Sequence, residues 1–412
     1  MPERVTPEPW AHPVLFLILF LPIGITNGYV VVTLAYLLSH AGVSVEAIAG
    51  LAALSLLPQT WKVIWAPIVD TTLTIKRWFL LSAIVTGALM IATAIVSPTS
   101  ANLILIEALV MAFSVASSFN AMAADSLMAH ATPPNEKGRA GGWSQAGNLG
   151  GSGLGGGAGL WLAQHVAGAW VPGAVLGLVC IASSGALLLL QEPPAAHRAT
   201  RYLASLRNVG REVWEILRSR MGFLALLIMT LPIGVGAAQN LWSAVAGDWH
   251  ASADAVALVN GALGGVISMV GCIAGGFLCD LMDRKTAYNV FGVVLAVCAA
   301  AMALAPKTQL TFVIFTCIYA FVLGFCYAAF GAIVLETIGA GAAATKYNLL
   351  AGISNAPIAY QTMIDGWAQT RYGSGGMLYV EALCGVGAVA LYFSVAAASR
   401  LVFPRGAPAA PS

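Results

Sequence analysis

The tetrapeptide Leu21-Pro22-Ile23-Gly24 recurs 210 residues later as Leu231-Pro232-Ile233-Gly234, and both copies lie inside long apolar runs. Two pairs of acidic residues keep nearly the same spacing at the ends of later apolar runs: Asp70 with Asp280, and Asp125 with Glu336. Three repeats in register predict a membrane protein built from two parallel halves. Transporters are commonly built in this way, with the solute bound where the halves meet.

Composition places the chain in the membrane. Of its 412 residues, 59% are hydrophobic and only 9% are charged, whereas soluble domains carry about 25% charged residues. The start of the chain leads into an apolar run too long for a cleaved secretory signal. The net charge of +2 predicts no nucleic-acid partner. The seven cysteines are odd in number and show no CxxC spacing, so we interpret them as packing residues and expect no metal and no cofactor.

The apolar runs predict an all-helical fold, because transmembrane strands would be about ten residues long and alternating. A spanning helix needs about 20 apolar residues. The candidates are 13–37, 46–69, 78–97, 101–125, 141–164, 169–190, 222–244, 255–280, 287–305, 308–336, 344–368 and 376–400. We therefore expect twelve transmembrane helices in two pseudo-symmetric six-helix bundles, over 1–190 and 221–412, joined by a cytoplasmic linker over 191–220.

The basic residues predict the orientation. With the N-terminus inside, sixteen of the 19 Lys and Arg residues lie on the inner side, and only Lys307 and Arg371 lie outside. We expect a multi-pass protein of the bacterial inner membrane with both termini cytoplasmic. In the linker, apolar residues recur at three- and four-residue steps over 203–217 with arginines between them. This pattern predicts an amphipathic helix on the inner membrane surface; a solvated basic linker is the alternative.

Glycines recur at every fourth position of the fifth predicted helix. They are Gly147, Gly151, Gly155 and Gly159. Four glycines on one face allow a neighbouring backbone to approach closely. The same stretch matches GxGxxG at Gly151, Gly153 and Gly156, but no strand precedes it, so we favour helix packing over a dinucleotide site.

The stretch from Gly276 to Lys285, GFLCDLMDRK, resembles the loop motif of the major facilitator superfamily. In that family a Gly, an Asp and a basic pair follow the second helix of each half. The first-half copy ends at Asp70 and lacks the Gly. The resemblance implies the major facilitator fold, with these loops forming a latch at the inner gate; a helix cap with loop anchors is the alternative. The gate candidates are Asp70, Asp125, Asp280, Arg284 and Glu336, of which Asp125 and Glu336 are expected at inner helix ends.

A narrower resemblance lies in 57–70, LPQTWKVIWAPIVD, which looks like the second helix of the peptide/acetyl-coenzyme A/drug transporter family. That family groups muropeptide permeases, acetyl-coenzyme A transporters and certain siderophore permeases. Residues 344–367 resemble the eleventh helix of its muropeptide permeases, although Lys346 and Asn348 stand where those proteins have Gln and Ala. Residues 133–139 resemble the loop after helix four. The resemblance implies proton-coupled transport of a polar solute.

Lys62 is the strongest single-residue signal, because a charged side chain inside the membrane is costly unless it faces water and a partner. We expect it to line the cavity between the bundles; snorkelling toward the inner headgroups is the alternative. The expected counter-ions, Glu107, Asp365 and Glu381, are also the candidates for proton coupling.

Amide side chains within the predicted helices complete the candidate binding set, and breaks at the repeated Pro and Gly residues would free backbone groups near them. With Lys62, the solute-binding candidates are Asn27, Gln59, Asn120, Gln145, Asn148, Gln239, Asn240 and Asn355. For any one amide, a helix–helix hydrogen bond is the alternative.

These features predict a secondary active transporter. No Walker A motif is present, so ATP does not drive the chain directly. We expect alternating access and proton-coupled import of a polar organic solute, muropeptide-, siderophore- or acyl-CoA-like, with an anionic solute fitting the cationic Lys62. The expected partners are the solute, protons and membrane lipid, and the protein is expected to be a monomer.

The alternatives are a proton-antiporting drug or metabolite exporter and a non-transporting sensor. A membrane-embedded acyltransferase is remote, because all six histidines lie in loops or at helix ends. We therefore expect no enzyme.

Overall fold

The structure, a computed structural model, describes residues 10–192, 210, 211, 214, 218, 220–338 and 343–402. Every regular element in these residues is a helix, as the apolar runs predict. Most of the expected linker over 191–220, including almost all of the expected amphipathic helix, lies outside the described residues.

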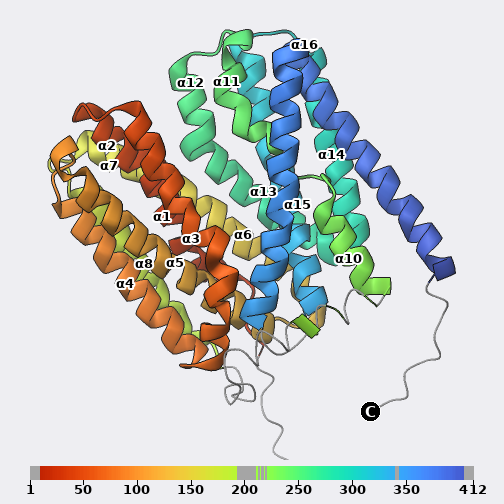
Figure 1. Ribbon diagram of the computed structural model, residues 1–412, viewed down its shortest axis with the longest axis horizontal. Coiled ribbons are helices and arrows are strands. Elements are labelled where there is room, and N and C mark those ends of the chain that lie inside the picture. Colours follow the sequence, from red (N-terminus) through yellow and green to blue (C-terminus); the bar gives the residue numbers. More distant parts are fainter. Residues whose placement is uncertain are drawn as a thin grey trace, which may run out of the picture.

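The first six membrane segments form one bundle, which is drawn in red to yellow-green in Figure 1. They are α1–η1–α2 (Val14–Gly28, Tyr29–Leu34, Ala35–His40), α3 (Val45–Thr71), α4 (Ile75–Ile95), α5 (Leu103–Ala131), α6–η4–α7 (Lys137–Gly153, Leu154–Ala158, Gly159–His165) and α8–η5 (Val171–Ala182, Ser183–Leu189).

The second bundle, in green to blue, contains the other six segments. They are the broken segment α10–η6–α11–η7 (Arg220–Thr230, Ala237–Leu241, Trp242–Val245, Ala246–Trp249), α12–η8–α13 (Ala253–Leu258, Val259–Leu263, Gly264–Asp280), α14 (Arg284–Leu304), α15 (Gln309–Ile338) and the two halves of α16 (Ala343–Val402). Gly373 divides α16, because its φ of 71° and ψ of −177° interrupt the helix. The twelve segments agree with the predicted spans to within a few residues.

Length and apolarity alone identify eight helical stretches among the described residues as membrane spans, and one of them, Thr345–Ser399, contains two segments. The remaining three segments are α3, α6–α7 and the broken seventh segment. These are the segments that carry Lys62, the glycine face and the second copy of the repeated tetrapeptide. The seventh segment does not meet the length criterion, because its longest helix, α10, has only 11 residues.

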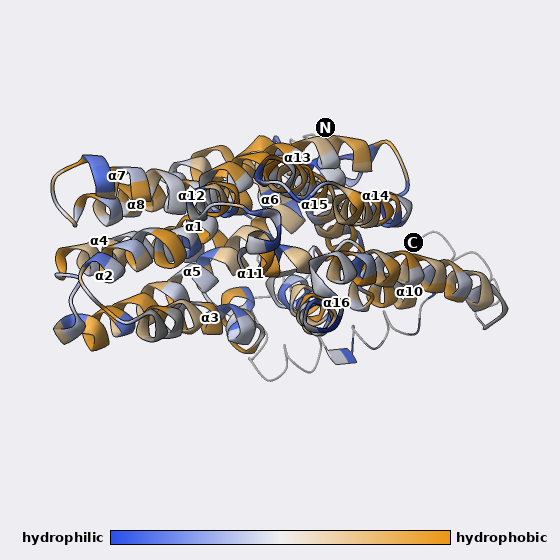
Figure 2. Ribbon diagram, turned by 90° about the horizontal axis from the view of Figure 1, so that it is seen from above, coloured by the Kyte–Doolittle hydropathy of each residue, from blue (hydrophilic) through white to orange (hydrophobic). Residues whose placement is uncertain are grey.

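Apolar residues run along most helices of both bundles (Figure 2). On α4 the exposed residues include Leu81, Ile84 and Val85, and on α14 Val290, Val294 and Val297 are exposed at helical spacing. Exposed apolar stripes of this kind are expected where a helix faces lipid.

The two copies of the repeated tetrapeptide have different structures. Pro22 lies within the continuous helix α1, whereas residues 231–236 contain no helix. In the second copy Gly234 has a φ of 63°, and the nearby Gly236 has a φ of 68°, values that strongly favour glycine. The seventh segment is therefore interrupted near its middle, while the first is not.

The predicted glycine face packs against α1. A Cβ built on Gly151 would lie 2.5 Å from the Leu21 carbonyl oxygen, and one on Gly155 would lie 2.2 Å from the Ile25 carbonyl oxygen. A Cβ on Gly24 of α1 would in turn lie 1.8 Å from the Asn148 carbonyl oxygen. The backbones of α1 and α6 touch directly, which confirms the packing prediction.

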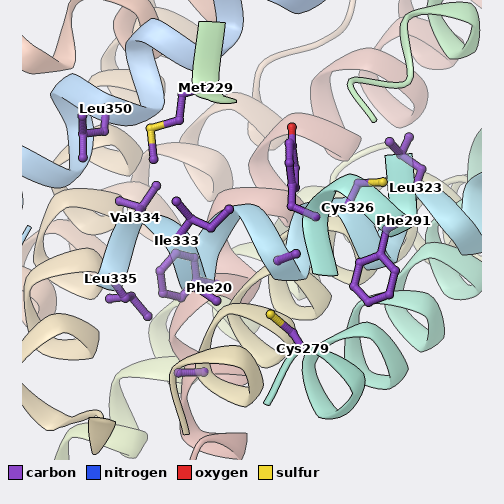
Figure 3. Packing of buried hydrophobic residues seen from close by; sticks show 14 of the residues in the cluster. Phe20, Met229, Cys279, Phe291, Leu323, Cys326, Ile333, Val334, Leu335 and Leu350 are labelled. Atoms are coloured by element: carbon purple, nitrogen blue, oxygen red, sulfur yellow. The ribbon is translucent and has the colours of Figure 1, made fainter. Parts of the chain in front are cut away.

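Small residues also join the two bundles, through α6 and α13. A Cβ on Gly142 would lie 2.5 Å from the Cys272 carbonyl oxygen, and one on Gly265 would lie 2.7 Å from the Gly153 Cα. The larger hydrophobic core contains residues of both bundles, and Figure 3 shows Phe20 of α1 close to Ile333 of α15. A separate core around Tyr29 belongs to the first bundle alone. The bundles thus share one core, and the first bundle has a second core of its own.

Candidate functional site

A cavity of about 310 Å³ lies between the bundles. The first bundle contributes residues of α1, α3, α5 and α6 to its wall, and the second contributes residues 234–235 and residues of α14, α15 and α16. Six of the predicted binding residues line it. They are Asn27, Gln59, Lys62, Gln145, Asn148 and Asn355. The structure therefore brings most of the predicted amide set together around the intramembrane lysine.

Asp125 and Lys62 lie on α5 and α3, which pack against each other in the first bundle. Both line the cavity, and the charge of Asp125 acts on Lys62. The side chain of Asn348, on α16 of the other bundle, hydrogen-bonds to Asp125. We expected Asp125 to act at an inner helix end. The structure instead places it, only 2% exposed, in the cavity wall.

The expected counter-ions of Lys62 lie elsewhere. Glu107 precedes Asp125 by 18 residues on the same helix, which is about 27 Å along the axis at 1.5 Å per residue. Neither Asp365 nor Glu381 lines the cavity; both are buried inside the second bundle. The sequence identified the charged residues but not which carboxylate faces Lys62.

Three predicted amides lie away from the cavity wall. Asn120 is buried and donates to the Phe79 carbonyl oxygen at 3.3 Å, so it ties α5 to α4. Asn240 donates to the Thr362 hydroxyl at 3.0 Å, and Gln239 beside it is exposed. For Asn120 and Asn240 the structure shows the alternative interpretation, a hydrogen bond between segments.

Aromatic residues form much of the remaining wall. Phe330 and Tyr327 of α15, Tyr288 of α14 and Tyr347 of α16 line the cavity with Phe20 of α1. A wall with rings, amides and one cation can hold a solute that has both apolar faces and polar groups.

A carboxylate and a helix N-terminus join the two bundles at one end of the cavity. Asp280, at the end of α13, accepts hydrogen bonds from the backbone N–H groups of Gly138 and Arg139 at 2.7 and 3.0 Å. It also accepts one from the Arg139 Nε at 3.2 Å. Because these N–H groups begin α6, the carboxylate also interacts favourably with the helix dipole.

The pseudo-symmetric contact joins the same bundles in the opposite sense. Asp70, at the end of α3, accepts hydrogen bonds from the Thr345 backbone N–H at 2.9 Å and the Thr345 hydroxyl at 2.7 Å. Thr345 lies in the first turn of α16. The sequence suggested Asp70 as a latch, but nothing in it singled out Thr345 as the partner.

Further contacts reinforce this end. Arg284 pairs with Glu336 at 3.4 Å and donates to the Pro134 carbonyl oxygen at 2.6 Å. Lys137 donates to the Leu335 carbonyl oxygen at 2.9 Å. Pro134 and Lys137 belong to the first bundle and the other residues to the second, so the Arg284–Pro134 and Lys137–Leu335 hydrogen bonds cross the junction between the bundles.

The opposite end of the cavity is open to solvent. Asn27 and Asn355 are exposed although each lies in the interior of a membrane segment. The ribbons of the two bundles also diverge away from the end at which these bonds join them (Figure 1). The structure is therefore closed at the bonded end of the cavity and exposed at the other end.

Comparisons with known proteins agree with this geometry. The sequence profile of the Major Facilitator Superfamily matches residues 14–360. No curated protein sequence matches the chain. Among solved structures, the Escherichia coli fucose:proton symporter FucP has a TM-score of 0.67 and 14% identity, covering 93% of this chain and 98% of its own.

Two further structures are similar. The human organic anion transporter TETRAN has a TM-score of 0.67 and 14% identity, with 92% of this chain and 98% of its own covered. The proton:xylose symporter XylE, solved with 6-bromo-6-deoxy-D-glucose, has a TM-score of 0.63 and 14% identity, with 93% and 95% covered. At this identity they share the fold. With the profile match over most of its length, two six-helix bundles and a cavity between them, the chain belongs to the Major Facilitator Superfamily and is a membrane transporter rather than an enzyme.

Proposed function

We propose that this transporter imports a polar organic solute that carries a negative charge, coupled to protons, and that Lys62 binds the charged group. One observation carries the proposal: the intramembrane lysine lines the cavity between the bundles, as does Asp125, whose charge acts on it. A charged lysine at the centre of a helix costs roughly 2.5–3.5 kcal/mol on insertion scales, and a neutral residue would avoid that cost. A role in binding an anion accounts for its presence.

The contacts around Lys62 suggest how solute binding reaches both bundles. An anionic solute group competes with Asp125 for Lys62. Asp125 also hydrogen-bonds to Asn348 of the second bundle. A solute that displaces Asp125 from Lys62 therefore changes a contact that crosses the junction, which is the differential interaction that alternating access requires.

The cavity volume bears on the class of solute. About 310 Å³ is at the lower end of the range of ligand pockets, roughly 300–1,000 Å³. This volume favours a solute of sugar or short-peptide size over a coenzyme A thioester. Among the solutes that the narrower family resemblance implies, small muropeptide fragments fit best.

We infer that the contacts that join the bundles at one end of the cavity form a closed gate, and the charges there support the proposed direction. The gate contains Lys137, Arg139 and Arg284, and Lys346 lies beside it, whereas Lys307 lies toward the opposite end. Basic residues mark the cytoplasmic side. The closed gate is then cytoplasmic, the cavity opens to the outside of a bacterial inner membrane, and a monomer takes solute from that side. Proton coupling is supported by the symporters of the same fold, FucP and XylE.

Uptake into proteoliposomes tests the proposal. The purified protein is reconstituted and offered radiolabelled small muropeptide fragments, a ferric siderophore and acetyl-coenzyme A, with or without an inside-alkaline pH gradient. We expect one small anionic solute to accumulate with the gradient, and a protonophore to abolish the accumulation. Lys62→Met should remove this uptake at matched reconstitution, whereas Arg371→Met, at an exposed cation, should not.

Two results would contradict the proposal. One is accumulation that requires the opposite gradient, which would indicate an exporter of the antiporter kind. The other is near-normal uptake by Lys62→Met, which would separate Lys62 from solute binding.

A further inference from the structure

A second polar cluster lies inside the second bundle, apart from the solute cavity. It consists of Gln361 and Asp365 on the first half of α16, Glu381 on its second half and Tyr319 on α15, each at most 7% exposed. Asp365 precedes Gly373 by eight residues and Glu381 follows it by eight. Because Gly373 folds the chain back, equal spacing from it places the two carboxyl groups at the same depth, about 12 Å from the turn.

The hydrogen bonds within this cluster leave three acceptor oxygens without a donor. Glu381 Oε1 accepts from the Tyr319 hydroxyl and from the Ala238 backbone N–H, and Asp365 Oδ1 accepts from Gln361 Nε2 at 2.8 Å. Three buried oxygens, Glu381 Oε2, Asp365 Oδ2 and Gln361 Oε1, have no hydrogen-bond partner among the described residues. A buried carboxylate oxygen without a donor is costly, and a proton on one of these oxygens provides the missing donor.

The charges around the two carboxyl groups also favour a proton bound to the pair. The two carboxyl groups act on each other, and the other titratable groups that face them are Tyr319 of α15, Cys298 of α14 and Cys384 of α16. Among the described residues, none of these neighbouring groups is a cation. Two adjacent carboxyl groups without a cation do not both ionise in a buried site, so the pair retains a proton.

A small cavity beside the pair shares wall residues with the solute cavity. A small cavity of about 10 Å³, roughly the room for one water molecule, reaches Glu381. Gly234 and Val235 line this small cavity and also line the solute cavity. The interrupted stretch 231–236 therefore forms the partition between the solute and the carboxyl pair.

We propose that the Asp365–Glu381 pair is the proton-binding site of this transporter, and that the interrupted stretch 231–236 connects its protonation to the solute cavity. The proposal rests on the proposed function, for which it names the coupling site. A proton passes from water in the solute cavity to an unpartnered oxygen of the pair, where an O–H bond forms and the negative charge of the pair falls by one. The hydrogen bond from the Ala238 N–H to Glu381 weakens, because a neutral carboxyl group accepts less strongly than a carboxylate. The stretch before Ala238 is then freer to move, and loss of the proton on the other side restores the bond.

Infrared difference spectroscopy tests the site without any solute. Purified protein is stepped from alkaline to acidic pH and the C=O band of protonated carboxyl groups is followed. We expect a band that Glu381→Gln removes and Asp365→Asn removes or shifts. Asp254→Asn, at an exposed carboxylate of α12, should leave that band in place. A band unchanged in both pair variants would overturn the proposal. A spectral change that Na⁺ alone produces at constant pH would do the same, because the pair would then be a metal-cation site.

The proposed passage of the proton through the small cavity has its own test, which uses two matched glycines of α16. A Cβ on Gly385, which lines the small cavity, would meet the Ala296 Cβ at 3.6 Å and the Pro232 carbonyl oxygen at 3.9 Å, so alanine fits there without strain. A Cβ on Gly387 meets nothing within 4 Å. After a pH jump, Gly385→Ala should slow the appearance of the band several-fold and Gly387→Ala should not. Equal rates would show that the proton does not use this cavity.

Transport separates this proposal from the function on which it rests. With the solute that the uptake panel identifies, Glu381→Gln should still exchange solute across the membrane but lose accumulation driven by the pH gradient, whereas Lys62→Met should lose both. If the pair titrates but no solute is taken up, the proposed function fails. If gradient-driven uptake is normal in Glu381→Gln, the coupling site fails and the proposed function stands.

Discussion

Gly24→Ala should destabilise the protein because α1 and α6 touch through their backbones at this position. The new Cβ would lie 1.8 Å from the Asn148 carbonyl oxygen and 2.6 Å from the Ser152 backbone nitrogen, and neither atom can rotate away. Ordinary contact begins at about 3.4 Å, so α1 must move outward by about 1.6 Å. Overpacking of this kind typically costs 1–3 kcal/mol, and we place this case at about 3 kcal/mol. The higher helix propensity of alanine offsets about 1 kcal/mol.

The net loss of about 2 kcal/mol corresponds to a Tm lower by roughly 4–8 °C for a unit the size of one bundle. Five cysteines of the described chain are buried and report unfolding when they react with a thiol-specific fluorophore. They are Cys180, Cys272, Cys279, Cys298 and Cys326. The matched control is Gly50→Ala on α3, where a Cβ meets nothing within 4 Å, so only the propensity gain remains and the Tm should rise. If Gly24→Ala raised the Tm together with the control, the backbone contact between α1 and α6 would be refuted.

Three further predictions concern the helix contact, the cavity and the gate. Gly151→Leu should lower both folded yield and uptake, because its Cβ alone would lie 2.5 Å from a carbonyl oxygen of α1; normal expression with normal uptake would contradict this. Lys62→Arg should restore only part of the uptake lost in Lys62→Met, because a planar guanidinium presents its donors differently; full rescue would favour the snorkelling alternative. Asp280→Asn should open the gate, because charge-assisted bonds of about 1.5–3 kcal/mol become neutral ones. Spin labels at the exposed residues Leu73 and Met282 should then report a longer distance, and an unchanged distance would show that Asp280 does not hold the gate.

The sequence alone determined the helices and their grouping. About 20 apolar residues are needed to cross a membrane, and backbone groups in lipid must be satisfied within a helix, so hydropathy specifies the segments. The repeated tetrapeptide and the paired acidic residues then indicate two halves. The cost of a charge in lipid likewise predicted that Lys62 faces the interior, and the structure places it in the cavity wall.

Only the tertiary structure decided which residues meet. The chain offers several carboxylates within its membrane segments, and the packing of α3 against α5 selects Asp125 as the one that faces Lys62, about 27 Å along α5 from Glu107. The packing of α5 against α4 turns Asn120 toward a carbonyl oxygen and away from the cavity.

The repeated tetrapeptide shows the same division most clearly. Both copies share the same four residues, yet α1 is continuous at Gly24 while the chain is interrupted at Gly234. Gly24 packs against the backbone of α6, whereas Gly234 adopts a positive φ beside Cys326 of α15. The second copy also has Gly236 where the first has Thr26, and Gly236 adopts a positive φ as well. The repeated residues alone therefore do not determine the backbone: the extra glycine permits the interruption, and the packing of Gly24 against α6 fits a continuous helix in the first copy.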